Sequence, residues 1–226
     1  KLCSVNDLVK DVDLDDSLSL STINDTAIVA DQWTEIKDAT DNSLGEFYYD
    51  SETQNIYYRA SGDYLAKLRY NVPKELQFSF VVKDNSNETT DAKDFTITVI
   101  GTNKPPVAKE IEPYILTPTS QPLVINIDDI AKDTNEDDEL NIYSIGDWIL
   151  NDTENEESFE IKGAIKIQVN KQNKTMRITI LNEEIWSIIE SLDLAIVVAD
   201  NSNAINHRSE NIIIKIKLLK DSSDSA

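Results

Sequence analysis

Two stretches of this chain repeat in order, and this repetition constrains the fold more than any other feature of the sequence. Residues 3–20 match residues 125–142 without a gap, at an offset of 122. Further along, residues 80–87 match residues 196–203 at an offset of 116. Two ordered matches with a small change of offset indicate a duplicated structural module whose loops differ in length.

The segment between the two copies, residues 100–107, reads Ile-Gly-Thr-Asn-Lys-Pro-Pro-Val. Pro105 and Pro106 lack a backbone donor, so a regular strand cannot continue through them. This pattern predicts a stiff, extended linker, and we place the two modules at 1–104 and 105–226. Only Lys1 and Leu2 precede the first matching block, so we expect a fragment whose first module has a truncated N-terminal strand.

Short runs of alternating apolar and polar residues, separated by polar clusters, fill both modules. Such runs are typical of strands, and six or seven in about 100 residues indicate an antiparallel β-sandwich in each module. In the first module they are residues 18–21, 27–30, 45–49, 56–58, 65–70, 76–82 and 95–100. In the second they are residues 123–127, 140–145, 159–161, 164–169, 176–180, 194–198 and 212–218.

Two local patterns refine this picture. Residues 45–58 predict a hairpin with Phe47 and Tyr49 on one face, because side chains alternate along a strand. Its aromatic residues are interpreted as core and cross-strand pairs, with a ligand-stacking platform as the alternative. Residues 183–191 predict a short helical insertion capped by Asn182, since the isoleucines there recur at helical spacing.

The bulk composition excludes several classes of protein. Hydrophobic residues make up 40% of the chain, which suits a folded protein, while the net charge is −21. So negative a chain repels nucleic acid and anionic membrane surfaces and attracts cations. Cys3 is the single cysteine, so an intramolecular disulfide is impossible. No apolar run reaches the length of a membrane span, and we expect no membrane insertion.

An acidic block recurs in both modules. Asp11 and Asp13 precede Asp15 and Asp16, and the copy holds Asp133, Asn135, Asp137 and Asp138. Carboxylates and amides at alternate positions of a bending loop can point at one centre, and calcium accepts oxygen ligands in such irregular loops. The alternative is a solvated acidic turn. The glycine-bearing loop of an EF-hand is absent from the sequence.

Three motifs resemble those of cadherins. Residues 131–145 resemble the signature Ala-x-Asp-x-Asp followed by an apolar-Tyr-Ser-Ile strand, and residues 197–200 resemble the later Val-x-Ala-x-Asp block. The linker resembles the Gly-Thr-Asn-Asp-Ala-Pro-Val junction of bacterial cadherin-like, VCBS-type tandem repeats, which occur in large secreted surface adhesins. This resemblance implies an all-β chain of two tandem Ig-like sandwiches, an extracellular or cell-surface location, and calcium at the junctions.

The resemblance also implies a set of ligands. Carried over by matching position, the calcium ligands are Asn103, Asp133, Asn135 and Asp200, assisted by Asp137 or Asp138. The matching positions of the first module, Asp11, Asp13 and Asp84, would face a preceding domain. Lys104 stands where the bacterial pattern has an aspartate, which removes one ligand.

We therefore expect a non-catalytic, calcium-dependent adhesion or spacer module. Its partners would be neighbouring repeats of the same chain and a host or cell-surface glycan or protein, and the fragment itself is expected to be a monomer. The alternatives are a receptor-binding module and an accessory domain pair of a secreted enzyme. His207 is the only histidine, and a zinc site or catalytic triad would need partners that the sequence does not supply.

Overall fold

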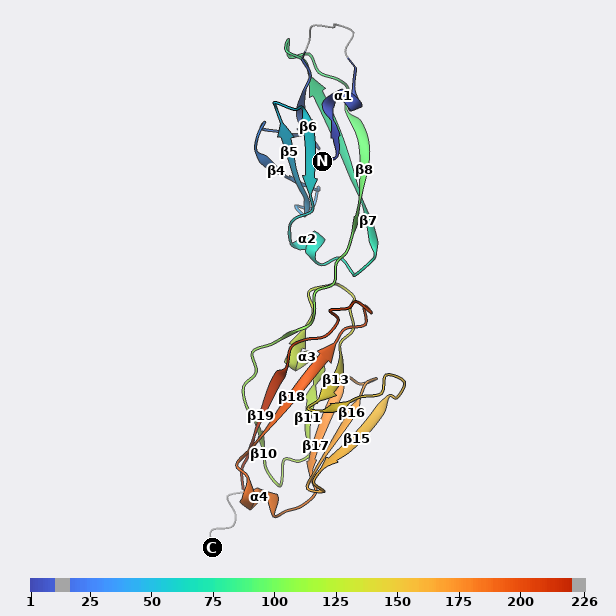
Figure 1. Ribbon diagram of the computed structural model, residues 1–226. Coiled ribbons are helices and arrows are strands. Elements are labelled where there is room, and N and C mark those ends of the chain that lie inside the picture. Colours follow the sequence, from blue (N-terminus) through green and yellow to red (C-terminus); the bar gives the residue numbers. More distant parts are fainter. Residues whose placement is uncertain (11–16, 221–226) are drawn as a thin grey trace. The chain divides into compact units, whose positions relative to one another are not determined.

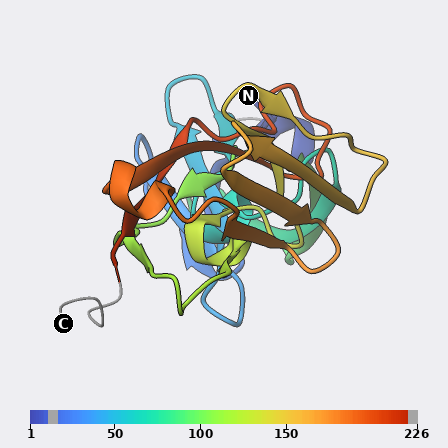
Figure 2. The same cartoon turned by 90° about the horizontal axis from the view of Figure 1, so that it is seen from below.

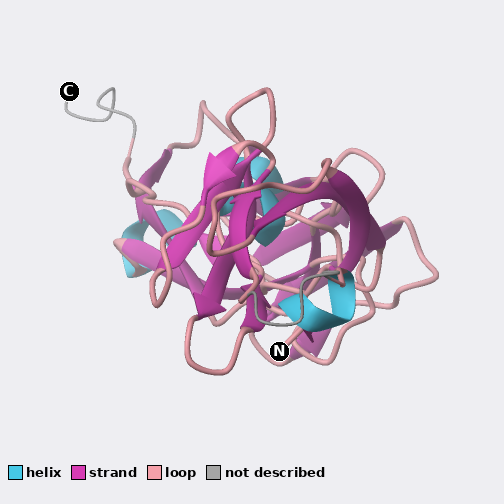
Figure 3. Ribbon diagram, turned by 90° about the horizontal axis from the view of Figure 1, so that it is seen from above, coloured by secondary structure: helices cyan, strands magenta, loops and turns pink. Residues whose placement is uncertain are grey.

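The computed structural model describes residues 1–10 and 17–220. The chain divides into two compact units, Lys1–Thr102 and Asn103–Ala226, which we call the first and second units (Figure 1). Strands dominate both units, and each of the helices in the described ranges is a single turn of four residues (Figure 3). The fold class is all-β, as the sequence predicts.

The first unit is a sandwich of two antiparallel four-stranded sheets, ordered β1-β6-β5-β4 and β3-β2-β7-β8. Its strands are β1 (Cys3–Ser4), β2 (Ser19–Ile23), β3 (Thr26–Ala27), β4 (Trp33–Lys37), β5 (Ser43–Asp50), β6 (Asn55–Arg59), β7 (Pro73–Lys83) and β8 (Lys93–Ile100). Its helical turns are α1 (Val5–Leu8) and α2 (Asp63–Ala66).

Alternation along the strands builds the core of the first unit. On β5, Phe47 and Tyr49 are buried while Tyr48 between them is only half-buried, and β7 alternates in the same way through Phe78 and Phe80. The predicted hairpin of residues 45–58 is confirmed, because β5 and β6 pair antiparallel with Tyr49 opposite Ile56. Phe47 and Phe78 meet edge to face across the two sheets, with ring centroids 5.0 Å apart.

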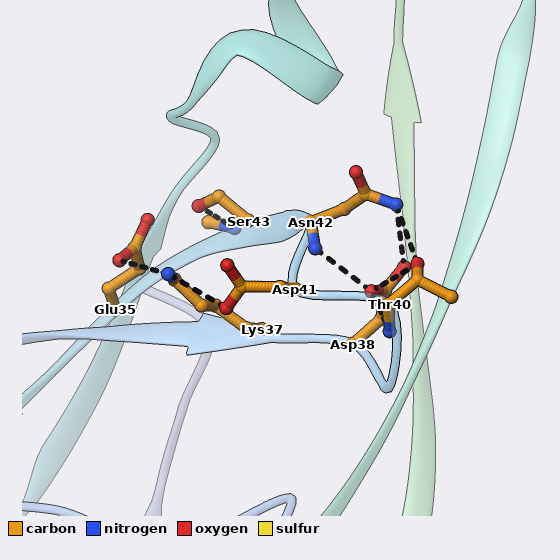
Figure 4. Close-up of polar contacts among 8 residues, drawn as sticks. Glu35, Lys37, Asp38, Thr40, Asp41, Asn42 and Ser43 are labelled. Carbon is orange, nitrogen blue, oxygen red and sulfur yellow. Dashed lines mark hydrogen bonds and ion pairs between the residues drawn. The ribbon is translucent and has the colours of Figure 1, made fainter.

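A compact polar turn joins β4 to β5 (Figure 4). The Asp38 carboxylate accepts hydrogen bonds from the backbone N–H groups of Thr40 and Asn42 and from both of their side chains. The hydroxyl of Thr40 contributes most, and together these donors lower the pKa of Asp38 to about 2. Asp41, at φ +68°, completes the reversal and pairs with Lys37 at 3.0 Å.

The second unit repeats this sandwich with additions. Its sheets are ordered β11-β17-β16-β15 and β10-β19-β18-β13-β14, with a small pair formed by β12 and β9. The pair β10–β19 is parallel. The strands are β9 (Val107–Ala108), β10 (Tyr114–Leu116), β11 (Leu123–Asn126), β12 (Ala131–Lys132), β13 (Asn141–Ile145), β14 (Trp148–Ile149), β15 (Glu156–Ile161), β16 (Ile165–Asn170), β17 (Thr175–Ile180), β18 (Ser191–Ala199) and β19 (Ile212–Leu218). The helical turns are α3 (Ile127–Ile130) and α4 (Ile185–Ile188).

The structural elements repeat at the offsets that the sequence predicts. Helical turn α3 follows α1 at an offset of 122, as does β13 after β2, and both of these strands carry a bulge at their middle. β7 and β18 end at Lys83 and Ala199, an offset of 116. Between these two blocks, the β6–β5 and β17–β16 ladders match at an offset of 120, which was not predicted from the sequence, so that the pair Tyr49–Ile56 corresponds to Val169–Met176.

Several predicted element boundaries are wrong. The predicted strand at residues 65–70 is instead the helical turn α2 followed by a loop, in which Tyr70 makes one isolated bridge to Gly101. Leu65 and Leu68 are three residues apart, a spacing that places both on one side of a helical turn, whereas a strand would place them on opposite faces. The strand expected at residues 123–127 ends at Asn126 for the same reason, since Ile127 and Ile130 share one face of α3. Strand β4 is missing from the prediction.

A single helical turn, α4, lies within the predicted insertion and connects β17 to β18 (Figure 2). Trp186 is its buried residue, whereas Ile188 is 68% exposed. The cap is Glu184 rather than the predicted Asn182. Asn182 instead accepts a hydrogen bond from the Glu184 N–H at 2.9 Å, which holds the turn before the helix.

Candidate metal site

The pairing of β13 with β18 assembles an acidic pocket in the second unit. Asn141, at the start of β13, lies opposite Ala199, at the end of β18. The acidic loop that enters β13 is therefore adjacent to Asp200, which directly follows β18. Asp200 is only 6% exposed, and Asn135 in the loop is 4% exposed. Buried polar residues at the ends of strands need partners, because an unsatisfied polar group costs free energy.

Three carboxylates meet in this pocket. One oxygen from each of Asp133, Asp138 and Asp200 lies within 4.8 Å of the other two. Burial raises the pKa of Asp133, hydrogen bonds from backbone N–H groups oppose the rise, and the charge of Asp200 adds to it. At neutral pH the three carboxylates repel one another, and a cation between them would relieve this repulsion.

Asn103, the first residue of the second unit, closes one side of the pocket. Its Nδ2 donates hydrogen bonds to Oδ2 of Asp200 at 3.0 Å and to the carbonyl of Asn206 at 3.2 Å. Asn206 returns a hydrogen bond from its own Nδ2 to the Asn103 carbonyl at 3.0 Å. This pair of side chains ties the segment after the linker glycine to the loop between β18 and β19.

Among the buried oxygens of the pocket, Oδ1 of Asn103 and Oδ2 of Asp133 have no hydrogen bond within the described part of the chain. Buried acceptors of this kind are uncommon in folded proteins and call for a partner such as water or an ion. Carboxylate and amide oxygens are hard ligands, and calcium binds them in irregular loops. The residues present therefore fit a calcium ion, which Asp133, Asp138, Asp200 and Asn103 would hold.

Asn135 makes a contact that its prediction as a ligand does not include. Its Oδ1 accepts a hydrogen bond from the backbone N–H of Lys104 at 2.7 Å. Its own N–H donates to Oδ1 of Asp133 at 2.8 Å. Asn135 thus holds the backbone of Lys104 and orients the carboxylate of Asp133.

The structure separates the two aspartates that the sequence could not rank. Asp138 belongs to the group of three carboxylates. Asp137 is exposed, has φ +64°, and lies outside that group. Asp137 therefore serves the turn, because aspartate tolerates the left-handed conformation better than most residues.

In the first unit, the structure describes one of the three predicted ligands. Asp84 follows β7, and its Oδ1 accepts hydrogen bonds at 2.8 Å from the backbone N–H groups of Ser86 and Glu88. The matching Asp200 caps its own loop in the same way, through the N–H of Ser202. The other two candidates, Asp11 and Asp13, lie outside the described residues.

Asn206 is the residue of this site that sequence reasoning missed. It lies in the loop between β18 and β19, which is longer than the matching loop between β7 and β8. The extra residues of this loop have no counterpart in the first module. A polar loop of variable length offers no periodic signal. The excess length of the loop beside a predicted ligand, Asp200, was the only sign that it could reach the linker.

Comparisons with known proteins give similar folds at low identity. Human mucin-like protocadherin EC1-2 is 9% identical with a TM-score of 0.47, over 91% of this chain and 85% of that one. Mouse cadherin-23 EC22-24 is 13% identical with a TM-score of 0.45, and mouse protocadherin-24 EC1-3 is 12% identical with a TM-score of 0.40. This chain spans 53% and 58% of those two structures, and they cover 91% of it. No protein-family model and no curated protein sequence matches the chain.

Proposed function

We propose that this chain is a non-catalytic, calcium-binding adhesion or spacer module that works outside the cell. The observation that carries the proposal is the pocket of Asp133, Asp138 and Asp200, in which three carboxylates converge beside buried oxygens that lack hydrogen bonds. None of the helices within the described ranges has the length and apolar character of a membrane span.

The role of the cation follows from the groups that surround it. Bound calcium would supply positive charge that offsets the repulsion among the three carboxylates. The Asn103 side chain donates a hydrogen bond to Asp200, and Asn135 accepts one from the backbone N–H of Lys104. The pocket is therefore connected to residues 103 and 104, the segment that follows the first unit. Neutralising the pocket would therefore hold this segment against the loops of the second unit. A spacer that is stiffer in a calcium-rich medium is the function that this arrangement supports best.

Isothermal titration calorimetry of the intact chain with CaCl₂ tests the proposal. We expect binding with a dissociation constant on the order of 10⁻⁴–10⁻³ M, as in extracellular calcium modules. Asp138→Asn should weaken it by about tenfold or more, because one charged ligand is lost. Asp137→Asn is the matched control: it lies in the same loop, is exposed, and keeps a residue that tolerates positive φ. Equal binding by both variants would refute the assignment of the pocket.

A further inference from the structure

The β4–β5–β6 sheet of the first unit (Figure 1) carries a row of aromatic side chains on its solvent-facing side. Trp33 lies opposite Tyr48 on the neighbouring strand, and Tyr48 lies opposite Tyr57 on the next. Their ring centroids are 5.5 Å and 6.1 Å apart. Phe47, Tyr49 and Ile56, which alternate with them, face the core. We call Trp33, Tyr48 and Tyr57 the aromatic row.

The aromatic row is accessible. Trp33 is 40% exposed, and Tyr48 and Tyr57 are of intermediate exposure. Exposed single aromatic residues are ordinary on protein surfaces, but three in register across three strands form a contiguous patch. Large exposed aromatic surfaces of this kind are enriched where proteins bind ligands, because the rings offer much contact area at little cost in conformational entropy.

The duplicated fold supplies an internal control for this row. At the matching positions of the second unit, Ser158 lies opposite Gln168, and Gln168 lies opposite Arg177. The core-facing neighbours stay apolar in both units, with Phe47 and Ile56 matched by Ile167 and Met176. The sandwich therefore requires apolar residues inside these strands but does not require aromatic residues outside. Stability of the fold alone does not explain the row.

Polar groups border the row and hold it in place. The guanidinium of Arg59 stacks over the Trp33 ring, 4.2 Å from its centroid, and makes two hydrogen bonds to the Glu46 carboxylate at 2.7 and 3.0 Å. The Asp31 carboxylate accepts hydrogen bonds from the backbone N–H and the hydroxyl of Ser51. Burial, followed by the charges of Asp31 and Asp50, raises the pKa of Tyr48.

These features select a class of ligand. Pyranose rings present faces of C–H groups that stack on aromatic rings, while their hydroxyls donate to carboxylates such as those of Asp31 and Glu46. The nearby carboxylates and the net charge of −21 disfavour polyanions, both nucleic acids and acidic polysaccharides. A compact cation would be held best by a cage of rings around it, whereas these three rings stand in a line across an open sheet. A line of rings suits an extended, uncharged chain.

We propose that the aromatic row of the first unit is a binding site for a neutral polysaccharide chain. The site is separate from the calcium pocket, since all of its residues belong to the first unit and the pocket belongs to the second. Polysaccharide binding should therefore be the same in calcium and in EGTA, and the two proposals can fail independently.

Affinity electrophoresis of the intact chain through gels containing soluble β-glucan, xylan or galactomannan tests the site, with alginate as the polyanionic comparison. We expect at least one neutral polymer to retard the chain and alginate to leave it unretarded. The variant Trp33→Ser, Tyr48→Gln, Tyr57→Arg carries the residues that the second unit tolerates at the same positions. Its apparent affinity should fall by about tenfold or more, because aromatic contacts are lost at three places.

Tyr70→Ser is the matched control, since Tyr70 is 39% exposed but lies outside the row. It should bind as the unmodified chain does. Far-ultraviolet circular dichroism and the melting temperature show that each variant is folded. Lack of retardation in every neutral polymer, retardation by alginate alone, equal binding by the triple variant, or loss of binding in EGTA would each overturn the proposal.

Discussion

At the residue scale, the candidate metal site depends on a few side chains that the repeated sequence could locate only in part. Asp133 and Asp200 were predicted from the resemblance, and the structure brings them together with Asp138. The sequence could not separate Asp137 from Asp138, because which of two adjacent side chains turns inward depends on the backbone, here a positive φ at Asp137. Asn206 could not be predicted, because its contact with Asn103 joins residues far apart in the chain.

Asp133 should destabilise the calcium-free protein. Burial and the charge of Asp200 raise its pKa in the folded state, so the stability that this group contributes is fully present below its unfolded pKa and is lost as the pH rises through the folded pKa. At neutral pH in EGTA, Asp133→Asn should therefore raise the melting temperature, and this gain should vanish at acid pH. Asp137→Asn should leave the melting temperature unchanged at both neutral and acid pH. A lower melting temperature for Asp133→Asn at neutral pH would contradict the account.

Two glycines with positive φ separate backbone strain from steric overlap. A Cβ at Gly45 would lie 2.6 Å from the Tyr58 ring and 2.8 Å from the Arg59 carbonyl, whereas a Cβ at Gly146 would meet nothing within 4 Å. Gly146→Ala should cost about 1–2 kcal/mol of unfolding free energy for the left-handed conformation alone. Gly45→Ala should cost more, because the β5–β6 pair must also shift. Urea denaturation measures both, and equal losses would show that Tyr58 moves aside freely.

At the element scale, strands with one buried face were predictable, because apolar residues that face the core then alternate with polar residues that face solvent. β7, with Leu76, Phe78, Phe80 and Val82 all buried, is the clearest case. The single-turn helices were not predictable in the same way. One turn contains only one pair of residues at helical spacing, such as Ile127 and Ile130 of α3, and a single pair is too short to establish a helical period. Strand β4 was missed since Ile36 is its only buried residue.

The β4–β5 turn should make the first unit sensitive to acid. Donors from Thr40 and Asn42 lower the pKa of Asp38 to about 2, below the value near 3.9 of an unfolded aspartate. A depressed folded pKa contributes stability that is present above the unfolded pKa and is lost as the pH falls toward the folded one. Asp38→Ala should therefore melt lower than the unmodified chain at pH 7, and the difference should shrink between about pH 4 and pH 2. A constant difference over that range would show that Asp38 acts through packing alone.

At the scale of the whole molecule, the duplication of the module made the fold predictable. Positions at which the two copies carry different residues indicate the candidate binding sites. The two units share strand order, bulges and core positions, so the sequence repeat was enough to predict two sandwiches. The same alignment shows where one copy departs from the other, as at the aromatic row. The net charge of −21 is the whole-chain property that links both proposals, because it favours cations and disfavours anionic ligands.

Calorimetric unfolding of the intact chain, in increasing calcium and in EGTA, tests the central claim most directly. A cation that binds only the folded state should raise the melting temperature with concentration, because it adds about 2.7 kcal/mol to the free energy of unfolding at one hundred times the dissociation constant. Asp138→Asn should blunt this rise, and Asp137→Asn should retain it. Superimposable unfolding curves in calcium and in EGTA would contradict the account and leave Asp133, Asp138 and Asp200 as a cluster of carboxylates without a cation.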